Sequence, residues 1–162
     1  MMATNPSNEQ YQKAAELAEA GKYEEALALM EQYLDQTPGD AQAWNDAAVL
    51  LHCLGRSDLA VEYLDRARGL SDDPRIVWNL VEALLAQADL ERALGLFGEL
   101  EKAGILSTDA LNRAACLCLG EGRLQQAADL LEWSCRIDPA QGQVLGQMIQ
   151  KIRSRSDATT TQ

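Results

Sequence analysis

The sequence predicts an all-α fold, a right-handed solenoid of about four helix–turn–helix repeats that ends in a C-terminal capping helix. One observation behind this is a motif that returns after 34, 33 and 34 residues, at Gly21, Gly55, Ala88 and Gly122. A period of that length is typical of stacked helical repeats. The other is composition, because hydrophobic residues make up 47% of the 162 residues but aromatic residues only 5%. Alanine and leucine dominate, and they suit close packing of helix on helix.

The second helix of each repeat is predicted by two columns of residues that follow the turn. The fifth residue after the turn position is always alanine, and the fourth residue after that alanine is always large and apolar. Residues four apart lie on the same face of a helix, so each pair forms part of one apolar stripe. The two columns are Ala26, Ala60, Ala93 and Ala127, followed by Met30, Leu64, Phe97 and Leu131.

The first helix of each repeat is predicted by four columns upstream of the turn. They hold Trp44, Ala47, Ala48 and Leu51, then Val77, Leu80, Val81 and Leu84, then Leu111, Ala114, Ala115 and Cys118. The first repeat matches least well, with Gln10, Lys13, Ala14 and Leu17 in these columns. A terminal repeat is expected to differ from the others, because its outer face meets water.

Turn signals set the predicted boundaries. Prolines interrupt the helices at "TPGD", "SDDPR" and "DPAQG", while in "AGILSTD" Gly104 is a helix stop and Ser107 or Thr108 the next N-cap. The predicted repeat domain, residues 7–154, contains repeats at 7–40, 41–73, 74–107 and 108–141 and a capping helix at 142–154. That helix is expected to cover the last repeat with one face, made of Val144, Leu145, Met148, Ile149 and Ile152. The polar ends, residues 1–6 and 155–162, are expected to be disordered.

The formal net charge of −11 bears on the class of partner. An acidic surface repels phosphate groups, so neither nucleic acid nor anionic lipid is an expected partner. A basic or amphipathic polypeptide is compatible with this charge. The sequence has no apolar run long enough to cross a membrane, and its first ten residues lack the basic and apolar regions of a signal peptide. We therefore expect a cytoplasmic protein without membrane insertion.

The sequence offers no constellation for catalysis, so we expect a non-enzymatic protein without metal or cofactor. His52 stands beside Cys53, but a metal site needs three or four converging ligands. A histidine on its own also lacks a partner that would activate it for catalysis. The cysteines at Cys116, Cys118 and Cys135 do not have the spacing of a zinc or redox motif. His52 is better explained as a hydrogen-bonding residue of a binding surface.

The repeats resemble the tetratricopeptide repeat. The stretch "AWNDAAVLLHCLGRSDLAVEYLDRA", residues 43–67, is closest to the family pattern, and the resemblance covers residues 8 to about 154. It implies an interaction module, an adaptor or chaperone, that binds a peptide segment or partner protein in a concave groove lined by the first helices. The residues at groove positions are Tyr11, Asn45, Val49, His52, Arg75, Trp78, Glu82, Asn112, Cys116 and Leu119.

The resemblance also suggests roles for some groove residues. Tyr11 and Trp78 are the expected anchors, because aromatic side chains often dominate protein interfaces. Asn45 and Asn112 are expected to hold a peptide backbone, since an amide both donates and accepts hydrogen bonds. Chaperone-docking members of the family clamp a C-terminal carboxylate with Lys and Arg. The corresponding positions here are Asn45, Glu82 and Asn112, so a carboxylate-terminated ligand is not expected.

Several alternatives stay open at this point. Trp78 either points into the groove or, if the alignment shifts by one residue, belongs to the core like Trp44. Trp133 either covers a neighbouring loop or the capping helix, or forms an outer surface for self-association or a second partner. In the second case the protein is a structural scaffold subunit that assembles through its convex face. A bacterial secretion chaperone built from the same repeats is a further alternative.

Overall fold

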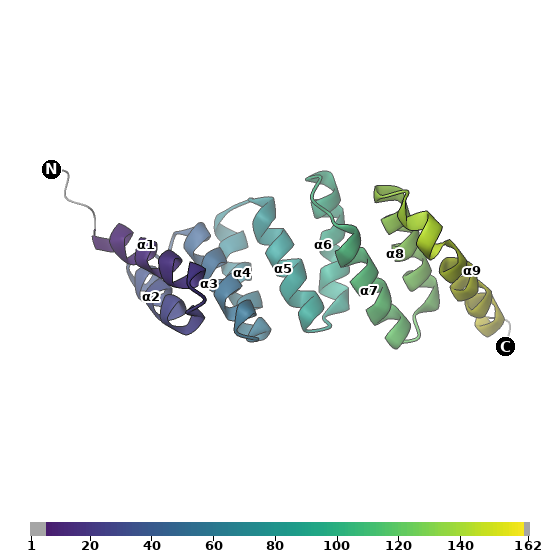
Figure 1. Ribbon diagram of the computed structural model, residues 1–162, viewed down its shortest axis with the longest axis horizontal. Helices are drawn as coiled ribbons and strands as arrows, with labels where there is room; N and C mark the ends of the chain where they lie inside the picture. The colour runs from purple at the N-terminus through teal and green to yellow at the C-terminus, as the bar shows by residue number, and fades with distance from the viewer. Residues whose placement is uncertain (1–5, 161–162) are drawn as a thin grey trace. The chain divides into compact units, whose positions relative to one another are not determined.

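The computed structural model describes residues 6–160, and within that range the chain forms nine helices and no strand (Figure 1). The predicted fold class, all-α with repeated helix pairs of the solenoid type, is confirmed. The helices are α1 (Pro6–Glu19), α2 (Tyr23–Gln36), α3 (Ala41–Cys53), α4 (Ser57–Leu70), α5 (Pro74–Ala86), α6 (Leu90–Lys102), α7 (Thr108–Gly120), α8 (Leu124–Ile137) and α9 (Gln141–Thr160).

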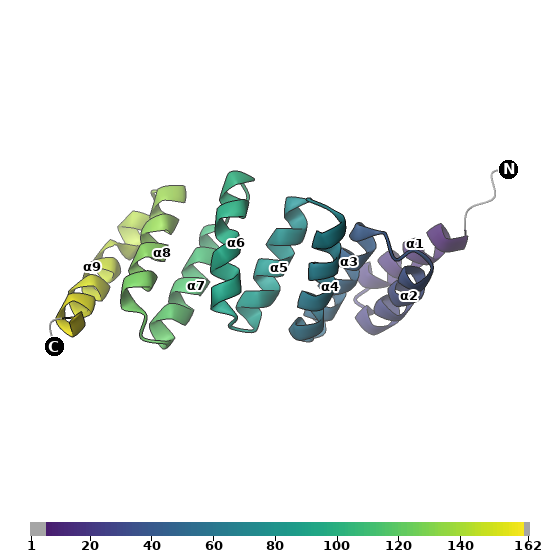
Figure 2. The ribbon, with the colours of Figure 1, turned by 180° about the vertical axis from the view of Figure 1, so that it is seen from behind.

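The chain divides into two compact units, which we describe separately. Unit 1 ends at Gln87 and contains α1 to α5, and unit 2 begins at Ala88 and contains α6 to α9. Within unit 1, the first helices α1, α3 and α5 form one layer and the second helices α2 and α4 form the other, as the two opposite views show (Figures 1 and 2). Within unit 2, α7 packs against α8, and α8 packs against α9.

The core of each unit is built from the predicted columns. The four column alanines are all 0% exposed, which leaves room for a neighbouring backbone to approach closely. The large residues four positions later are buried as well, with Phe97 at 0% and Leu64 at 1% exposed. The first-helix columns from Ala47 to Leu51, from Val77 to Leu84 and from Leu111 to Cys118 are buried in the same way, whereas Trp44, predicted with them, is only half-buried. The 34-residue period therefore corresponds to one buried stripe per helix.

The turns follow the predicted chemistry. Gly21, Gly55 and Gly122 have φ values of 75°, 74° and 74°, a left-handed conformation that glycine adopts without steric cost. Ala88 takes the same conformation, with φ of 58°, although its Cβ disfavours it. Gly104 also ends its helix with a positive φ of 72°, and the Ser107 hydroxyl caps the next helix by accepting a hydrogen bond from the Ala110 amide at 3.1 Å.

The last helix differs from the prediction in length. α9 continues to Thr160, so residues 155–160, which were expected to be disordered, are helical. From Gln147 to Thr160 the sequence contains neither Gly nor Pro to end the helix. Arg153 also ties it to α8 through Asp129 and Glu132, at 2.9 and 2.8 Å. At the other end, α1 begins at Pro6, and residues 1–5 of the expected disordered terminus lie outside the described residues.

The face of α9 that covers unit 2 also differs from the prediction. Ile152 is 6% exposed, and Leu145 and Ile149 are half-buried. Val144 and Met148, which were expected on the same buried face, are 77% and 48% exposed. Neighbouring residues in a helix are rotated by about 100°, so the five apolar residues divide between a buried and an exposed direction.

The left-handed conformation of Ala88 leads to a stability prediction. Replacing Ala88 with glycine removes the Cβ strain, and we expect Ala88→Gly to raise the free energy of unfolding by about 1 kcal/mol. The measurement is urea denaturation followed by circular dichroism. Gly55→Ala is the matched control, because a Cβ there meets nothing within 4 Å and adds only strain at φ +74°. It is expected to lower stability by a similar amount. A lower stability in Ala88→Gly would contradict the prediction.

Candidate functional site

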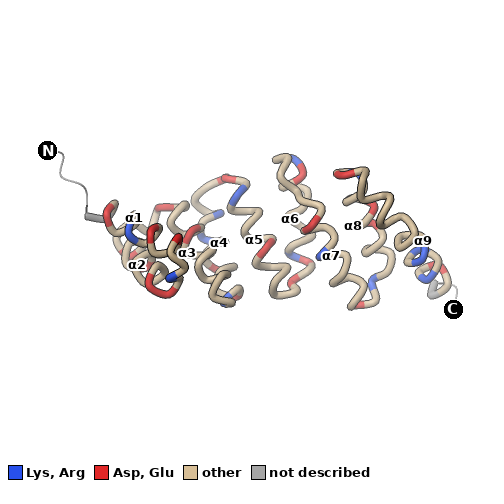
Figure 3. The backbone as a smooth tube through the Cα atoms, viewed as in Figure 1, with Lys and Arg blue, Asp and Glu red and all other residues tan. Residues whose placement is uncertain are grey.

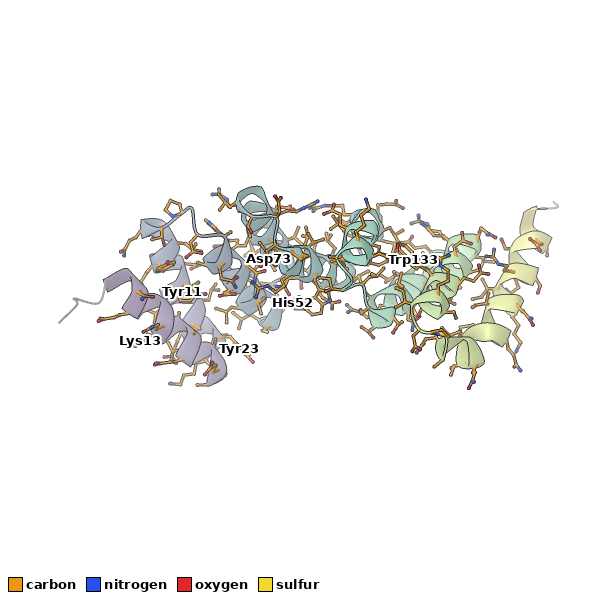
Figure 4. The ribbon with its side chains drawn as sticks, turned by 90° about the horizontal axis from the view of Figure 1, so that it is seen from above. Tyr11, Lys13, Tyr23, His52, Asp73 and Trp133 are labelled. Carbon is orange, nitrogen blue, oxygen red and sulfur yellow. The ribbon has the colours of Figure 1, made fainter. Side chains whose placement is uncertain are left out.

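The first helices of unit 1 present a continuous set of side chains on one side, which we call the first-helix face. It brings together seven of the predicted site residues: Tyr11 on α1, Asn45, Val49 and His52 on α3, and Arg75, Trp78 and Glu82 on α5. Hydrogen bonds and shared pockets join α1 to α3 and α3 to α5. Figure 4 labels Tyr11 and His52 among the side chains of these helices.

A polar network crosses the amino-terminal half of this face. The Tyr11 hydroxyl donates a hydrogen bond to the Asp46 carboxylate, which also accepts from the side-chain amides of Gln42 at 2.7 Å and Asn45 at 3.3 Å. From the next helix, the Asn79 amide donates to the Asn45 carbonyl oxygen at 2.8 Å. The network therefore links α1, α3 and α5 through their side chains.

Asn45 is consequently a structural residue of this face. It is only 7% exposed, and its amide both donates and accepts within the network. The expectation that it holds a peptide backbone is thus not supported by its position. Its partner Asn79 is not among the predicted site residues, although the two asparagines are separated by 34 residues, which is the repeat length. That spacing is the signal that would have found the pair.

Arg75 also has a partner within its own helix terminus. Its guanidinium lies 2.6 Å from the carboxylate of Asp73, the N-cap of α5. The hydrogen bonds from Arg75 lower the pKa of the Asp73 carboxyl. A longer contact of 3.5 Å connects Arg75 to Gln42 and so to the polar network. This arginine therefore extends the network at the edge of the face.

The carboxyl-terminal half of the face contains two pockets on either side of Val49. The pocket between α3 and α5, about 140 Å³ in volume, is lined by Ala48, Val49, His52, Leu64, Trp78, Asn79 and Glu82. The pocket between α1 and α3, about 240 Å³, is lined by Ala14, Ala15, Ala18, Glu19, Met30, Asp46, Val49 and Leu50. Both are predominantly apolar, and each is large enough to take a side chain of a ligand.

Two large apolar side chains remain accessible at these pockets. Trp78 is 40% exposed and Val49 is 39% exposed, although their neighbours in sequence, such as Val77, Ala48 and Leu50, are buried in the core of unit 1. The exposure of Trp78 excludes the alternative in which it belongs to the core. The charged residues around the pockets are Glu19, Asp46 and Glu82, and neither pocket is lined by a Lys or Arg. The face therefore combines apolar pockets with a negative electrostatic potential from the carboxylates around them.

His52 has a local hydrogen-bonding role. Its Nδ1 lies 3.1 Å from the Ser57 hydroxyl oxygen, across the turn that joins α3 to α4. Among the described residues, no group of three His, Cys, Asp or Glu side chains is placed to hold a metal ion. The contact with Ser57 orients the imidazole at the rim of the pocket between α3 and α5.

The other three predicted site residues lie on α7 of unit 2. Cys116 is exposed and Asn112 is half-buried, with its amide 3.4 Å from the Gln141 carbonyl oxygen. Leu119 lines a groove along α9. These residues belong to unit 2, whereas the first-helix face belongs to unit 1.

Trp133 packs on α6, which matches neither a loop or capping-helix contact nor a fully outer surface, the two alternatives left open by the sequence. Its indole NH donates to Glu101 at 2.7 Å, and its ring meets Phe97 edge-on with centroids 6.0 Å apart. The Arg136 guanidinium lies 5.9 Å from the ring centre. Trp133 is therefore a half-buried residue that connects α8 to α6 (Figure 4).

Comparisons with known proteins agree with this architecture. A family model described as tetratricopeptide repeat matches residues 11–74. These residues of the chain, about two fifths of its length, therefore resemble the tetratricopeptide repeat. No curated protein sequence matches it. Members of this family are in general interaction modules without catalytic activity.

Several solved structures share the fold of this chain. One is MamA 41-end from Desulfovibrio magneticus RS-1, with a TM-score of 0.75 and 19% identity, covering 98% of this chain and 90% of that chain. A second MamA crystal structure has a TM-score of 0.77 and 14% identity, covering 96% and 86%. YrrB, described as a TPR protein with an unusual peptide-binding site, has a TM-score of 0.63 and 21% identity, covering 80% and 68%.

Within the matched residues, the environment of Tyr11 perturbs its phenol. Burial, and then the hydrogen bond to Asp46, raise the pKa of its phenol. The Tyr33 ring of α2 lies beside the Tyr11 ring, with the two ring centroids 5.3 Å apart.

None of the helices among the described residues has the length and hydropathy that a membrane-spanning segment needs.

The Tyr11–Asp46 hydrogen bond yields a prediction for pH-dependent stability. We expect Tyr11→Phe to lower the free energy of unfolding by about 1 kcal/mol at neutral pH. A phenol whose pKa is higher in the folded than in the unfolded protein stabilises fully below about pH 10. This stabilisation is lost as the pH rises through the folded value. Stability should thus fall less steeply above pH 10 in Tyr11→Phe, as measured by urea denaturation from pH 8 to 11.

Tyr23→Phe is the control for this experiment, because Tyr23 begins α2 and takes no part in the network around Asp46. It is expected to keep the slope of the unaltered protein. Identical slopes for Tyr11→Phe and the unaltered protein would show that the Tyr11 contact does not contribute in solution.

Proposed function

We propose that the first-helix face of unit 1 binds a peptide segment of a partner protein, and that the chain acts as a non-enzymatic adaptor. The observation that carries this proposal is the pair of apolar pockets on either side of Val49, with Trp78 accessible at one of them. An aromatic side chain at a pocket is a common energetic centre of protein interfaces. The described peptide-binding site of YrrB, a protein of the same fold, supports peptide binding by such repeats.

The ligand we propose carries bulky apolar residues and nearby Lys or Arg side chains. The apolar residues would enter the pockets, which lie next to each other and share Val49. The basic residues would lie opposite Glu19, Asp46 and Glu82, which surround the pockets without a cation among the lining residues. Unit 1 is also strongly acidic, with 15 Asp and Glu against 6 Lys and Arg up to Gln87. This charge favours encounter with a basic segment.

The polar network supports the proposal by making the pockets rigid. Because Asp46 and Asn45 are held by neighbours on three helices, the spacing of α1, α3 and α5 is defined before a ligand arrives. A preformed site loses less entropy on binding than one that must be ordered. The scaffold alternative has weaker support, since Trp133 is largely occupied by Phe97 and Glu101. A chaperone role and a cytoplasmic location stay predictions.

The test compares two tryptophan variants. A random peptide display library selected on the full chain should yield peptides with a bulky apolar residue near Lys or Arg. Fluorescence anisotropy then measures the affinity of one selected peptide. Trp78→Ala should weaken binding about thirtyfold, as expected for a loss of about 2 kcal/mol at an interface centre.

Trp133→Ala is the matched control and should leave the affinity of that peptide unchanged. Higher salt should weaken binding to the unaltered protein, because it screens the attraction between the basic residues and the carboxylates around the pockets. If Trp133→Ala abolishes binding and Trp78→Ala does not, the binding surface lies elsewhere and the proposal is wrong.

A further inference from the structure

A second apolar surface, which we call the α9 groove, lies in unit 2 and is unrelated to the first-helix face. Its volume is about 750 Å³, and it is lined by Leu119, Gly122, Leu124, Val144, Gln147, Met148, Lys151, Ile152 and Arg155. The exposed side chains of Val144 and Met148, which were expected to be buried, form its α9 wall. From Val144 to Arg155, the wall is about 17 Å long, or three helical turns.

The position of these residues within α9 explains why they are exposed. The fourth, eighth and eleventh residues of α9 are Val144, Met148 and Lys151. In α7, which is followed by its second helix α8, the same three positions hold Leu111, Ala115 and Cys118, and each of these is 0% exposed. α9 thus occupies the place of the first helix of a fifth repeat, and among the described residues no second helix covers this side.

The charges along the groove indicate what kind of helix fits there. Lys151 and Arg155 line the carboxyl-terminal half of the α9 wall. A second helix runs antiparallel to the first, so its first turns would lie against this half. Negative side chains are favoured in the first turn of a helix, where the helix dipole is positive. Three of the four second helices described, α2, α4 and α6, have acidic residues in their first turn, and α8 has none.

The distribution of charge over the chain supports the same conclusion. Unit 2 has 10 acidic and 8 basic residues, whereas unit 1 is far more acidic. The last ten residues described, 151–160, contain three basic residues and one acidic residue, and the basic positions appear along the end of α9 in Figure 3. Unit 2 already contains one such pairing, because Arg123 at the turn before α8 lies 2.6 Å from Glu91 in the first turn of α6.

From these observations we propose that the α9 groove binds an amphipathic helix of a partner protein that is acidic in its first two turns. The helix lies antiparallel to α9 and takes the place of the second helix of a fifth repeat. Its apolar stripe, with residues at i, i+3 or i+4 and i+7, contacts Val144, Met148 and Leu124. Its acidic residues face Lys151 and Arg155. This site is independent of the proposed function of the first-helix face.

The probe for this site is a fluorescently labelled peptide of residues 22–37, which contains α2 with both of its flanking residues. It has the required pattern, with Glu24 and Glu25 in the first turn and an apolar stripe of Ala26, Leu27, Met30 and Leu34. Anisotropy titration with the full chain should show saturable binding. In a second peptide, Glu24→Lys and Glu25→Lys should weaken that binding about tenfold.

Variants of the full chain locate the binding. Met148→Glu places a charge on the apolar wall and should reduce the affinity for the probe at least about tenfold. Lys151→Gln should reduce it about threefold. Gln150→Glu is the matched control, because it changes the net charge by the same amount on an exposed residue of α9 outside the groove, and should leave binding unchanged. Thermal melting should show the same folded state in all three variants.

Three results would overturn the proposal. The first is the absence of saturable binding by the peptide of residues 22–37. The second is equal affinity of that peptide for Met148→Glu and the unaltered chain. The third is an oligomer of the chain alone, detected by light scattering, that Met148→Glu converts to monomer, because the occupant of the groove would then be a second copy.

Discussion

The structure depends on one constraint: a pair of helices cannot bury its apolar stripe without a neighbouring pair. The column of alanines in the second helices, all 0% exposed, lets adjacent helices approach closely enough to satisfy this need. Each first helix then buries one apolar stripe in the core, while another side of the helix stays accessible to solvent. In unit 1 that accessible side forms the first-helix face, so the proposed binding surface is a consequence of how the core is built.

The same constraint explains the polar network. Helices that are held only by small apolar contacts can slide relative to one another, whereas directional hydrogen bonds define their spacing. Asp46 receives hydrogen bonds from Tyr11, Gln42 and Asn45, and Asn79 extends the chain of contacts to α5. The network occupies the polar groups of the amino-terminal half of the face. The apolar pockets beside Val49 and Trp78 are left as the surface that a ligand can use.

Much of the fold was predictable from the sequence because burial repeats with the same period as the residues. The columns beginning at Ala26 and Ala47 needed only spacing and size to be recognised. The site was less predictable, since a column places a side chain on a face but does not reveal its partner. Asn45 lies on the expected face and yet bonds to Asn79. Trp133 lies outside the apolar stripe, and its contact with Glu101 depends on the packing of α8 against α6.

Helix α9 shows again that a sequence pattern does not reveal which side of a helix its neighbours cover. The apolar residues of α9 fit the pattern of a first helix, and the pattern alone does not say which of its two sides is covered. The uncovered side carries Lys151 and Arg155, while Glu19, Asp46 and Glu82 surround the pockets of the first-helix face. Opposite charges at the two surfaces discriminate between ligands, because a segment suited to one is repelled by the other. The two proposed sites therefore call for ligands of opposite charge.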